Sequence, residues 1–226
     1  MKKLFLIYIL FSFLTISTAQ NKVKKINVMD YGIVANTKEN VTAKVNKLIE
    51  GLGSEPVQIV FPKGRYEFYP DKAYFKEYYE SNTYDATRKL ALLIKNKKNI
   101  SIDAQQSDFV YHEHMQPFTL DNAENITIKN VNIDWDVPLT SEGEVIEADS
   151  KHILMRIDIT QSPYKVHEKG LTFVGENANE NWQLADGSWL IEYDKNHIIP
   201  ANTGDNGCVN GDLKNVKYSE ENQALY

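Results

Sequence analysis

Apolar and polar residues alternate in two stretches of the chain that lie at a fixed interval. The stretches Leu93–Asp103 and Thr119–Lys129 begin 26 positions apart, and both contain an Asn turn followed by the alternation Asn-Ile-Ser/Thr-Ile. Self-similarity at a period of about 20 to 50 residues is typical of solenoids, in which each repeat packs on its neighbours. The pattern therefore predicts an all-β fold, a right-handed parallel β-helix with alternate apolar side chains in a narrow core.

The spacing of apolar residues differs near the start of the chain. Residues 26–32 alternate and end in a turn, and residues 57–61 predict a buried strand that turns at 62–64 into the next strand. Between them, helical spacing is found at Val41, Val45, Leu48 and Ile49. We expect a short helix here that caps the first coil, since an uncapped coil would expose an unpaired strand edge and an open core.

After Pro138 the coil pattern stops. Residues 143–157 predict a hairpin with its turn at 148–151, and residues 171–174 and 189–193 predict further strands. These strands are expected to form a small antiparallel, barrel-like β insertion beside the coils. The predicted organisation is a signal peptide at 1–19, the cap and first coils at 20–137, and the antiparallel subdomain at 138–226.

The first 19 residues predict export. Lys2 and Lys3 precede an apolar run, Leu4–Leu14, and Thr15–Ala19 has the small residues of a cleavage site. A single membrane helix is the alternative, but the apolar run is shorter than the roughly 20 residues needed to span a bilayer. We expect a mature chain without a transmembrane anchor in the periplasm, on the outer surface or outside the cell.

Composition and charge limit the classes of function that the chain can have. The chain has 25 basic and 31 acidic residues, and loss of the two lysines of the signal peptide changes the formal charge from -6 to -8, which argues against nucleic-acid binding. Cys208 is the only cysteine, so an internal disulfide is excluded. The 13 Tyr and 9 Phe suit stacking on sugar rings, although aromatic residues also serve as core and cross-strand pairs.

The second coil carries two aligned carboxylates. Inward-pointing residues are expected at Ile126, Ile128, Val131, Ile133 and Trp135. Asn132, Asp134 and Asp136 then share the outer face. The Cβ atoms of the two aspartates would lie about 6.6 Å apart, near the lower end of the acid–base spacing of inverting glycosidases. Asp134 and Asp136 are therefore the candidate catalytic residues, with Asn132 as a candidate substrate-binding residue.

His112 and Trp135 complete the candidate substrate-binding set. Aligning Phe109 with Ile133 and Tyr111 with Trp135 places His112 beside Asp136, where it could orient the carboxylate or hold a sugar hydroxyl. The alternative is a solvated polar stack on the outside of a solenoid. In the alternation His112-Glu113-His114, two histidines would share one face of a strand without a third ligand, so we expect neither a metal nor another cofactor.

Two resemblances accompany these patterns. Val28-x-Asp30-Tyr31-Gly32, a helix, and Val57-x-Ile59-x-Phe61-Pro62-x-Gly64-x-Tyr66 resemble the start of pectate-lyase-like β-helix proteins, although residues 35–42 depart from the usual Gly/Asp-rich turn. A narrower resemblance, to glycoside hydrolase family 110, covers residues 28–175 and rests on Phe61-Pro-Lys-Gly-Arg-Tyr-Glu-Phe68, Tyr79-x-Ser81-Asn82, Lys98-Asn-Ile-Ser-Ile-Asp103, Pro117-Phe118 and Asn132-Ile-Asp134-Trp135-Asp136-x-Pro138.

The narrower resemblance implies an exo-acting α-galactosidase. Such enzymes remove terminal α-1,3-linked galactose from glycans by an inverting, metal-independent mechanism, and they carry β-barrel insertions. Family members are much longer than this chain, which ends at Tyr226 without a recognisable closing coil. We therefore expect an N-terminal fragment, inactive by itself if the principal carboxylates lie in later coils.

Two other functions stay open. A polysaccharide lyase on the same scaffold would form an unsaturated, ultraviolet-absorbing sugar and usually needs a calcium site and a basic proton acceptor, for which no Asp cluster with Arg or Lys stands out. A non-catalytic carbohydrate-binding surface protein would bind glycans and leave them intact. The galactosidase would instead release galactose, initially as the β anomer.

Overall fold

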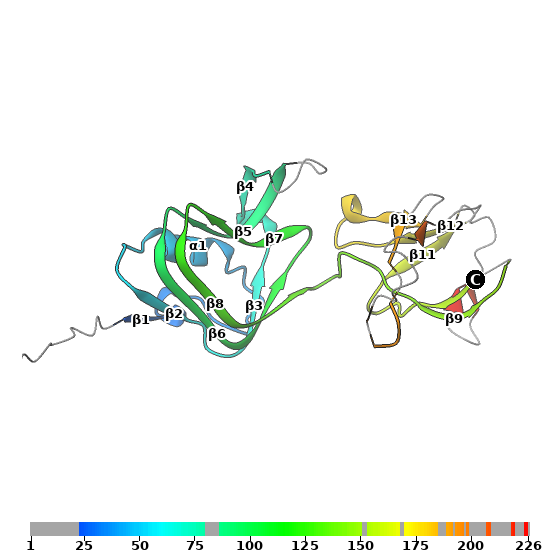
Figure 1. Ribbon diagram of the computed structural model, residues 1–226, viewed down its shortest axis with the longest axis horizontal. Helices are drawn as coiled ribbons and strands as arrows, with labels where there is room; N and C mark the ends of the chain where they lie inside the picture. Colours follow the sequence, from blue (N-terminus) through cyan, green and yellow to red (C-terminus); the bar gives the residue numbers. More distant parts are fainter. Residues whose placement is uncertain are drawn as a thin grey trace, which may run out of the picture.

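The computed structural model describes residues 23–79, 86–150, 153–167, 170–184, 189–191, 193–196, 198, 207–208, 218–219 and 224–225. The expected signal peptide at 1–19 lies outside these residues. Strands predominate in the part described, and Figure 1 shows the antiparallel strands after β8 gathered apart from the earlier ones. Helical structure comprises α1 (Thr42–Glu50) and the short 3-10 segments η1 (Val28–Tyr31), η2 (Pro70–Lys72) and η3 (Ala178–Glu180).

A parallel sheet forms around the long strand β6. Its members are β1 (Lys24–Asn27), β2 (Val57–Val60), β3 (Arg65–Phe68), β6 (Lys98–Tyr111) and β8 (Glu124–Trp135). The first half of β6 pairs with β2 and its second half with β3, whereas β8 pairs along both halves. Ile59, Ile102 and Ile128 are consequently aligned across three strands. Apolar side chains at equivalent positions of each strand thus build one continuous core.

A second sheet consists of β4 (Tyr74–Glu77), β5 (Thr87–Lys95) and β7 (Met115–Asp121). β5 pairs with β7 in parallel, and Leu93 lies opposite Thr119, the residue 26 positions later. The same offset aligns Ile100 with Ile126 in the first sheet. The two stretches with the repeated pattern therefore lie side by side over their whole length, as the sequence predicts.

Asparagines make the turns between the two sheets. Asn96, Asn99, Asn122 and Asn125 have positive φ angles of 53°, 58°, 48° and 53°. Asparagine tolerates this left-handed backbone better than most residues do. The amide of Asn122 donates to Asn96 at 2.7 Å, and that of Asn125 donates to Asn99 at 3.1 Å. The predicted Asn turns are thus stacked in pairs, which joins one repeat to the next.

The cap helix α1 confirms the helix expected over this segment. Its apolar residues Val45 and Ile49 are buried in the core. Asn46, also buried, donates to the carbonyl of Ala91 at 2.7 Å and accepts from the amide of Leu93 at 3.1 Å. One side chain therefore satisfies two backbone groups of β5 and attaches the helix to that sheet.

The strands after Pro138 pair in the antiparallel sense. They are β9 (Glu144–Ala148), β10 (Ile153–Arg156), β11 (Tyr164–His167), β12 (Gly170–Phe173), β13 (Trp182–Leu184), β14 (Trp189–Leu190), β15 (Gly207–Cys208), β16 (Tyr218–Ser219) and β17 (Ala224–Leu225). β9 and β10 form the predicted hairpin, and β12 pairs with β11 and β13. Ile157, Leu171 and Phe173 form a separate small core. No helix among the described residues is long and apolar enough to cross a membrane.

Asp103 stabilises the point at which β6 bends. The pairing of β6 with β8 shifts register between Asp103 and Ser107, and Asp103 accepts hydrogen bonds from the Asn130 amide at 2.9 Å and the backbone N–H of Gln105 at 3.2 Å. The bond from Asn130, more than any other contact, lowers the pKa of the Asp103 carboxyl. Its folded-state pKa therefore lies below that of the unfolded chain.

We predict that Asp103→Asn lowers the free energy of unfolding at neutral pH. A carboxyl with a depressed folded pKa stabilises above its unfolded pKa, and this contribution is lost as pH falls through the folded pKa. The difference from wild type should therefore shrink below about pH 4. Urea titrations across pH measure it, with the exposed Asp30→Asn as control. A difference from wild type that stays constant down to about pH 2 would contradict the prediction.

Candidate functional site

The ends of strands β3, β6 and β8 lie side by side in the sheet. Phe68 of β3 lies opposite Tyr111 of β6, and Tyr111 lies opposite Trp135 of β8. The next residue of each strand, Tyr69, His112 and Asp136, follows in the same order. The ladder continues there, because the N–H of His112 donates to the Phe68 carbonyl and the N–H of Asp136 to the Tyr111 carbonyl, both at 3.0 Å. The parallel register thus stacks a tyrosine, a histidine and an aspartate.

Arg65 connects Asp136 to the neighbouring carboxylate of Glu67. Arg65 and Glu67 are two positions apart in β3 and project from the same face. The guanidinium donates from Nε to Glu67 Oε1 and from Nη2 to Asp136 Oδ1, each at 2.6 Å. The bond to Glu67, with a smaller effect of Asp136, raises the pKa of Arg65, although partial burial opposes the shift. Arg65 is thus held as a cation between two carboxylates.

Glu67 is almost fully buried, with 4% of its surface exposed. Besides Arg65, its partner is His112, whose ring Nε2 lies 3.0 Å from Glu67 Oε2. His112 is equally buried, at 5% exposure. Burial of a carboxylate is costly unless it is paired and hydrogen-bonded, and Arg65 and His112 fulfil both conditions here.

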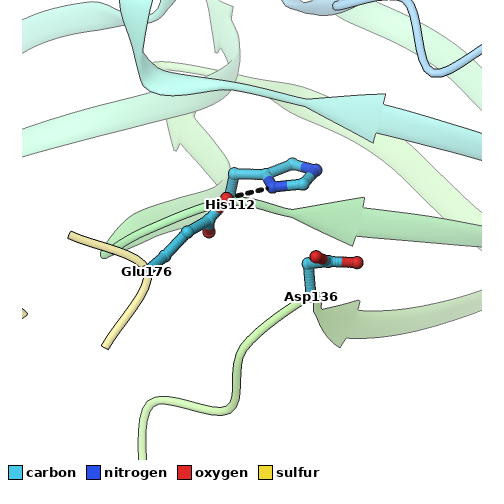
Figure 2. Close-up of side chains that lie close together, drawn as sticks. All are labelled: His112, Asp136 and Glu176. Carbon is cyan, nitrogen blue, oxygen red and sulfur yellow. Dashed lines mark hydrogen bonds and ion pairs between the residues drawn. The ribbon is translucent and has the colours of Figure 1, made fainter. Parts of the chain in front are cut away.

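The other ring nitrogen of His112 faces Glu176. Figure 2 shows this glutamate approaching from a separate segment, with Asp136 below the ring in this view. Nδ1 lies 2.5 Å from Glu176 Oε1. The Tyr69 ring stacks on the imidazole, with centroids 3.6 Å apart and planes inclined by 10°. Burial, followed by the negative charges of Glu67, Asp136 and Glu176, raises the pKa of Tyr69.

The segment that carries Glu176 docks through backbone contacts as well. It connects β12 to η3, and Glu176 Oε2 accepts the N–H of Glu113 at 2.8 Å. Glu180 Oε1 accepts the N–H of His114 at 2.7 Å. Two glutamates therefore bind the turn between β6 and β7, at the two residues that follow the buried His112.

The candidate residues from sequence are only partly brought together. The predicted alignment that places His112 beside Asp136 is present in the structure. Asp134 accepts the N–H of its neighbour Trp135, and Asn132 donates to Asp108 at 2.9 Å, so neither joins the network around His112. Both are exposed on β8. The two candidate catalytic aspartates thus differ in environment: Asp136 contacts the network around His112, and Asp134 does not.

Two expectations on local structure need correction, one on the burial of Ile133 and one on the strand at 112–114. Ile133 was expected in the core but is 46% exposed, because β8 has no further strand on its outer side in the described part of the chain. Trp135 packs inward near Tyr111, with ring centroids 5.7 Å apart, as the alternation predicts, and its role in substrate binding stays a prediction. The residues His112, Glu113 and His114 form a turn with Glu113 at φ 56°, and the expected strand alternation is absent. Both ring nitrogens of His112 lie at hydrogen-bond distance from glutamates, and its role in holding a sugar hydroxyl stays a prediction.

Several members of the network were not found from sequence. Arg65 and Glu67 stand in the motif that predicts a turn and a strand, and extending the coil alignment by one strand would have placed them beside His112. Glu176 is 64 positions away from His112 in sequence. It approaches from the antiparallel region, where no shared register with the coils exists, so no local pattern indicates it.

His112, Asp136 and Glu176 are residues of the metal-ligand type, and one ligand atom of each lies within 4.8 Å of the others. Two ligands of one tetrahedral zinc ion lie about 3.3 Å apart, given metal–ligand bonds of roughly 2.0 Å. The distance of 2.5 Å between His112 Nδ1 and Glu176 Oε1 is shorter, and Asp136 is already paired with Arg65. We therefore interpret the cluster as a hydrogen-bonded charge network.

Comparisons with known proteins agree on one family. Residues 141–225 match the family described as GLAA-B beta-barrel domain I. Over 81% of its length, the chain is 41% identical to alpha-1,3-galactosidase B of Bacteroides thetaiotaomicron. It is 32% identical over 80% of its length to alpha-1,3-galactosidase B of Bacteroides fragilis, and 33% identical over 76% to alpha-1,3-galactosidase A of Shewanella woodyi.

The alignments cover 29%, 31% and 28% of these three relatives, so the chain spans about three tenths of their length. The match in the antiparallel region begins three residues after Pro138, where the coil pattern stops. The resemblance expected from the sequence motifs is thereby confirmed, and it is consistent with an N-terminal portion of the larger proteins.

We predict that Glu67→Gln lowers the free energy of unfolding by about 1–3 kcal/mol, because it removes the buried anion that satisfies Arg65 and His112. Chemical denaturation at neutral pH measures the change. Glu144→Gln, which removes the exposed ion pair with Arg156, is the control and should cost less than about 0.5 kcal/mol. Equal, small effects of the two substitutions would show that the network does not stabilise the fold.

Proposed function

Since the chain is homologous to part of the α-1,3-galactosidases of glycoside hydrolase family 110, we propose that it serves in the removal of terminal α-1,3-linked galactose from glycans by inversion. The observation that carries this proposal is the 41% identity over 81% of the chain to a protein of that name. Because the chain spans three tenths of that protein, we propose the activity for the whole enzyme, to which this chain contributes scaffold and part of the sugar-binding surface.

We also propose that the parallel strands are coils of a right-handed β-helix. The 26-residue offset, shared by both sheets, and the stacked asparagines support this fold. In the same proposal, residues 20–137 form the cap and first coils and residues 138–226 the inserted barrel-like subdomain. Export rests on the sequence of residues 1–19 alone.

Asp136 is the better supported of the two candidate catalytic residues. Its carboxylate is exposed to the extent of 46% and is held in place by Arg65. The Arg65 guanidinium donates to Asp136 Oδ1 at 2.6 Å and so fixes the orientation of the carboxylate. We therefore propose that Asp136 accepts a hydrogen bond or a proton from substrate or water. Asp134 takes part in the reaction only if a bound sugar ring contacts both aspartates.

The activity is tested by incubating the whole enzyme that contains this chain with an oligosaccharide that ends in α-1,3-linked galactose and following the products by proton NMR. We expect free galactose, initially as the β anomer. An unsaturated, ultraviolet-absorbing product would instead establish the lyase. Reversible binding without any product would establish a carbohydrate-binding protein, and the absence of both binding and product would contradict all three functions.

The residue assignment is tested by Asp136→Asn and Asp134→Asn. Loss of a general acid or base lowers turnover by about 10²- to 10⁴-fold, and we expect the larger loss for Asp136. Glu144→Gln on the exposed strand β9 is the matched control and should leave turnover unchanged. Full turnover and unchanged affinity in both aspartate variants would show that this face is not the site.

A further inference from the structure

His112 contacts a carboxylate with each of its ring nitrogens. Nε2 lies 3.0 Å from Glu67 Oε2, and Nδ1 lies 2.5 Å from Glu176 Oε1. A neutral imidazole has one N–H donor and one bare nitrogen, whereas the imidazolium ion has two donors. With a neutral ring, one nitrogen lone pair would face a carboxylate oxygen at hydrogen-bond distance without a proton between them. The geometry thus requires one proton beyond that of a neutral ring, and an imidazole is ordinarily more basic than the carboxylates that could bind it instead.

The surrounding charges favour the same form. The ionisable groups that face the ring come from four segments: Arg65 and Glu67 from β3, Tyr69 at the start of η2, Asp136 after β8, and Glu176 before η3. Three carboxylates and one guanidinium leave an excess of two negative charges around a buried ring. A charged His112 reduces that excess to one, and the stacked face of Tyr69 favours a cation further.

We propose that His112 is an imidazolium ion whose charge docks residues 175–180 onto the turn at 112–114, and that loss of its proton releases this segment. The inference goes beyond the proposed reaction and does not depend on it. Glu67 fixes the ring from the parallel sheet, and Glu176 approaches it from the antiparallel region. His112 is therefore the residue through which the two regions are joined electrostatically.

Docking also determines what surrounds Asp136. A carboxylate oxygen of Asp136, one of Glu176 and a ring nitrogen of His112 lie within 4.8 Å of each other. The docked segment therefore forms one side of the space next to the Asp136 carboxylate. Release would remove Glu176 from that space and leave the Arg65–Asp136 pair in place, since Arg65 lies in β3 and Asp136 directly follows β8.

The charge of His112 is tested by nitrogen NMR of the whole chain labelled with ¹⁵N-histidine, recorded with a chelator so that no metal ion replaces the proton. We expect one histidine with both ring nitrogens protonated at about pH 7, a signal that His112→Gln removes and His167→Gln keeps. A neutral tautomer for His112 under these conditions would overturn the proposal.

Docking is tested by amide hydrogen exchange at Glu113 and His114, corrected for the intrinsic effect of pH. We expect Glu176→Gln to accelerate exchange at Glu113 by about tenfold or more and to abolish the doubly protonated ring, and deprotonation of wild type to accelerate exchange at both residues. Glu180→Gln is the matched control, because it removes the negative charge from the acceptor of the His114 N–H and leaves Glu176 unchanged.

Glu176 is partly exposed, so we expect Glu176→Gln to fold. This variant therefore tests the proposal even if His112→Gln does not fold. Unchanged exchange and an unchanged ring in Glu176→Gln would contradict the docking role. The docking role would also be contradicted if the amides of Glu113 and His114 stay protected from exchange after His112 of the wild type is deprotonated.

Discussion

The parallel register of β3, β6 and β8 is the constraint on which the site depends. Because Phe68, Tyr111 and Trp135 are aligned, the residue that follows each of them falls in one column, and Tyr69, His112 and Asp136 stack at the end of the sheet. A shift of one strand by one residue would turn its side chains to the opposite face and separate the column. The buried aromatic residues that hold the register therefore also position the charged ones.

The charged residues then form a chain of alternating sign, from Asp136 through Arg65, Glu67 and His112 to Glu176. Its centre is buried and its two ends are partly exposed. Buried charges are tolerated when each is paired and hydrogen-bonded, and removal of one leaves its neighbours uncompensated. The network thus favours one arrangement of the strand ends and of the loop that docks on them, and it holds Asp136 in place through Arg65.

Much of the parallel region was predictable, because its signals are local. The Asn-Ile alternation predicts the pairing of Ile100 with Ile126, and alignment of aromatic residues places His112 beside Asp136. Ile133 was expected in the core from alternation alone, which does not show whether a neighbouring strand covers the position. Glu176 was not predictable, since its contact joins two regions without a common register. The role of His112 in docking the second region depends on Glu176, so this role was not predictable either.

A double-mutant cycle between Glu67→Gln and Asp136→Asn tests the account most directly. No hydrogen bond or ion pair between these two side chains is described, and Arg65 contacts both. If the network acts as one unit, the two changes in the free energy of unfolding should deviate from additivity by more than about 0.5 kcal/mol, as for groups that share a partner. Additivity within about 0.3 kcal/mol would mean that Asp136 is independent of the buried pair, contrary to the account.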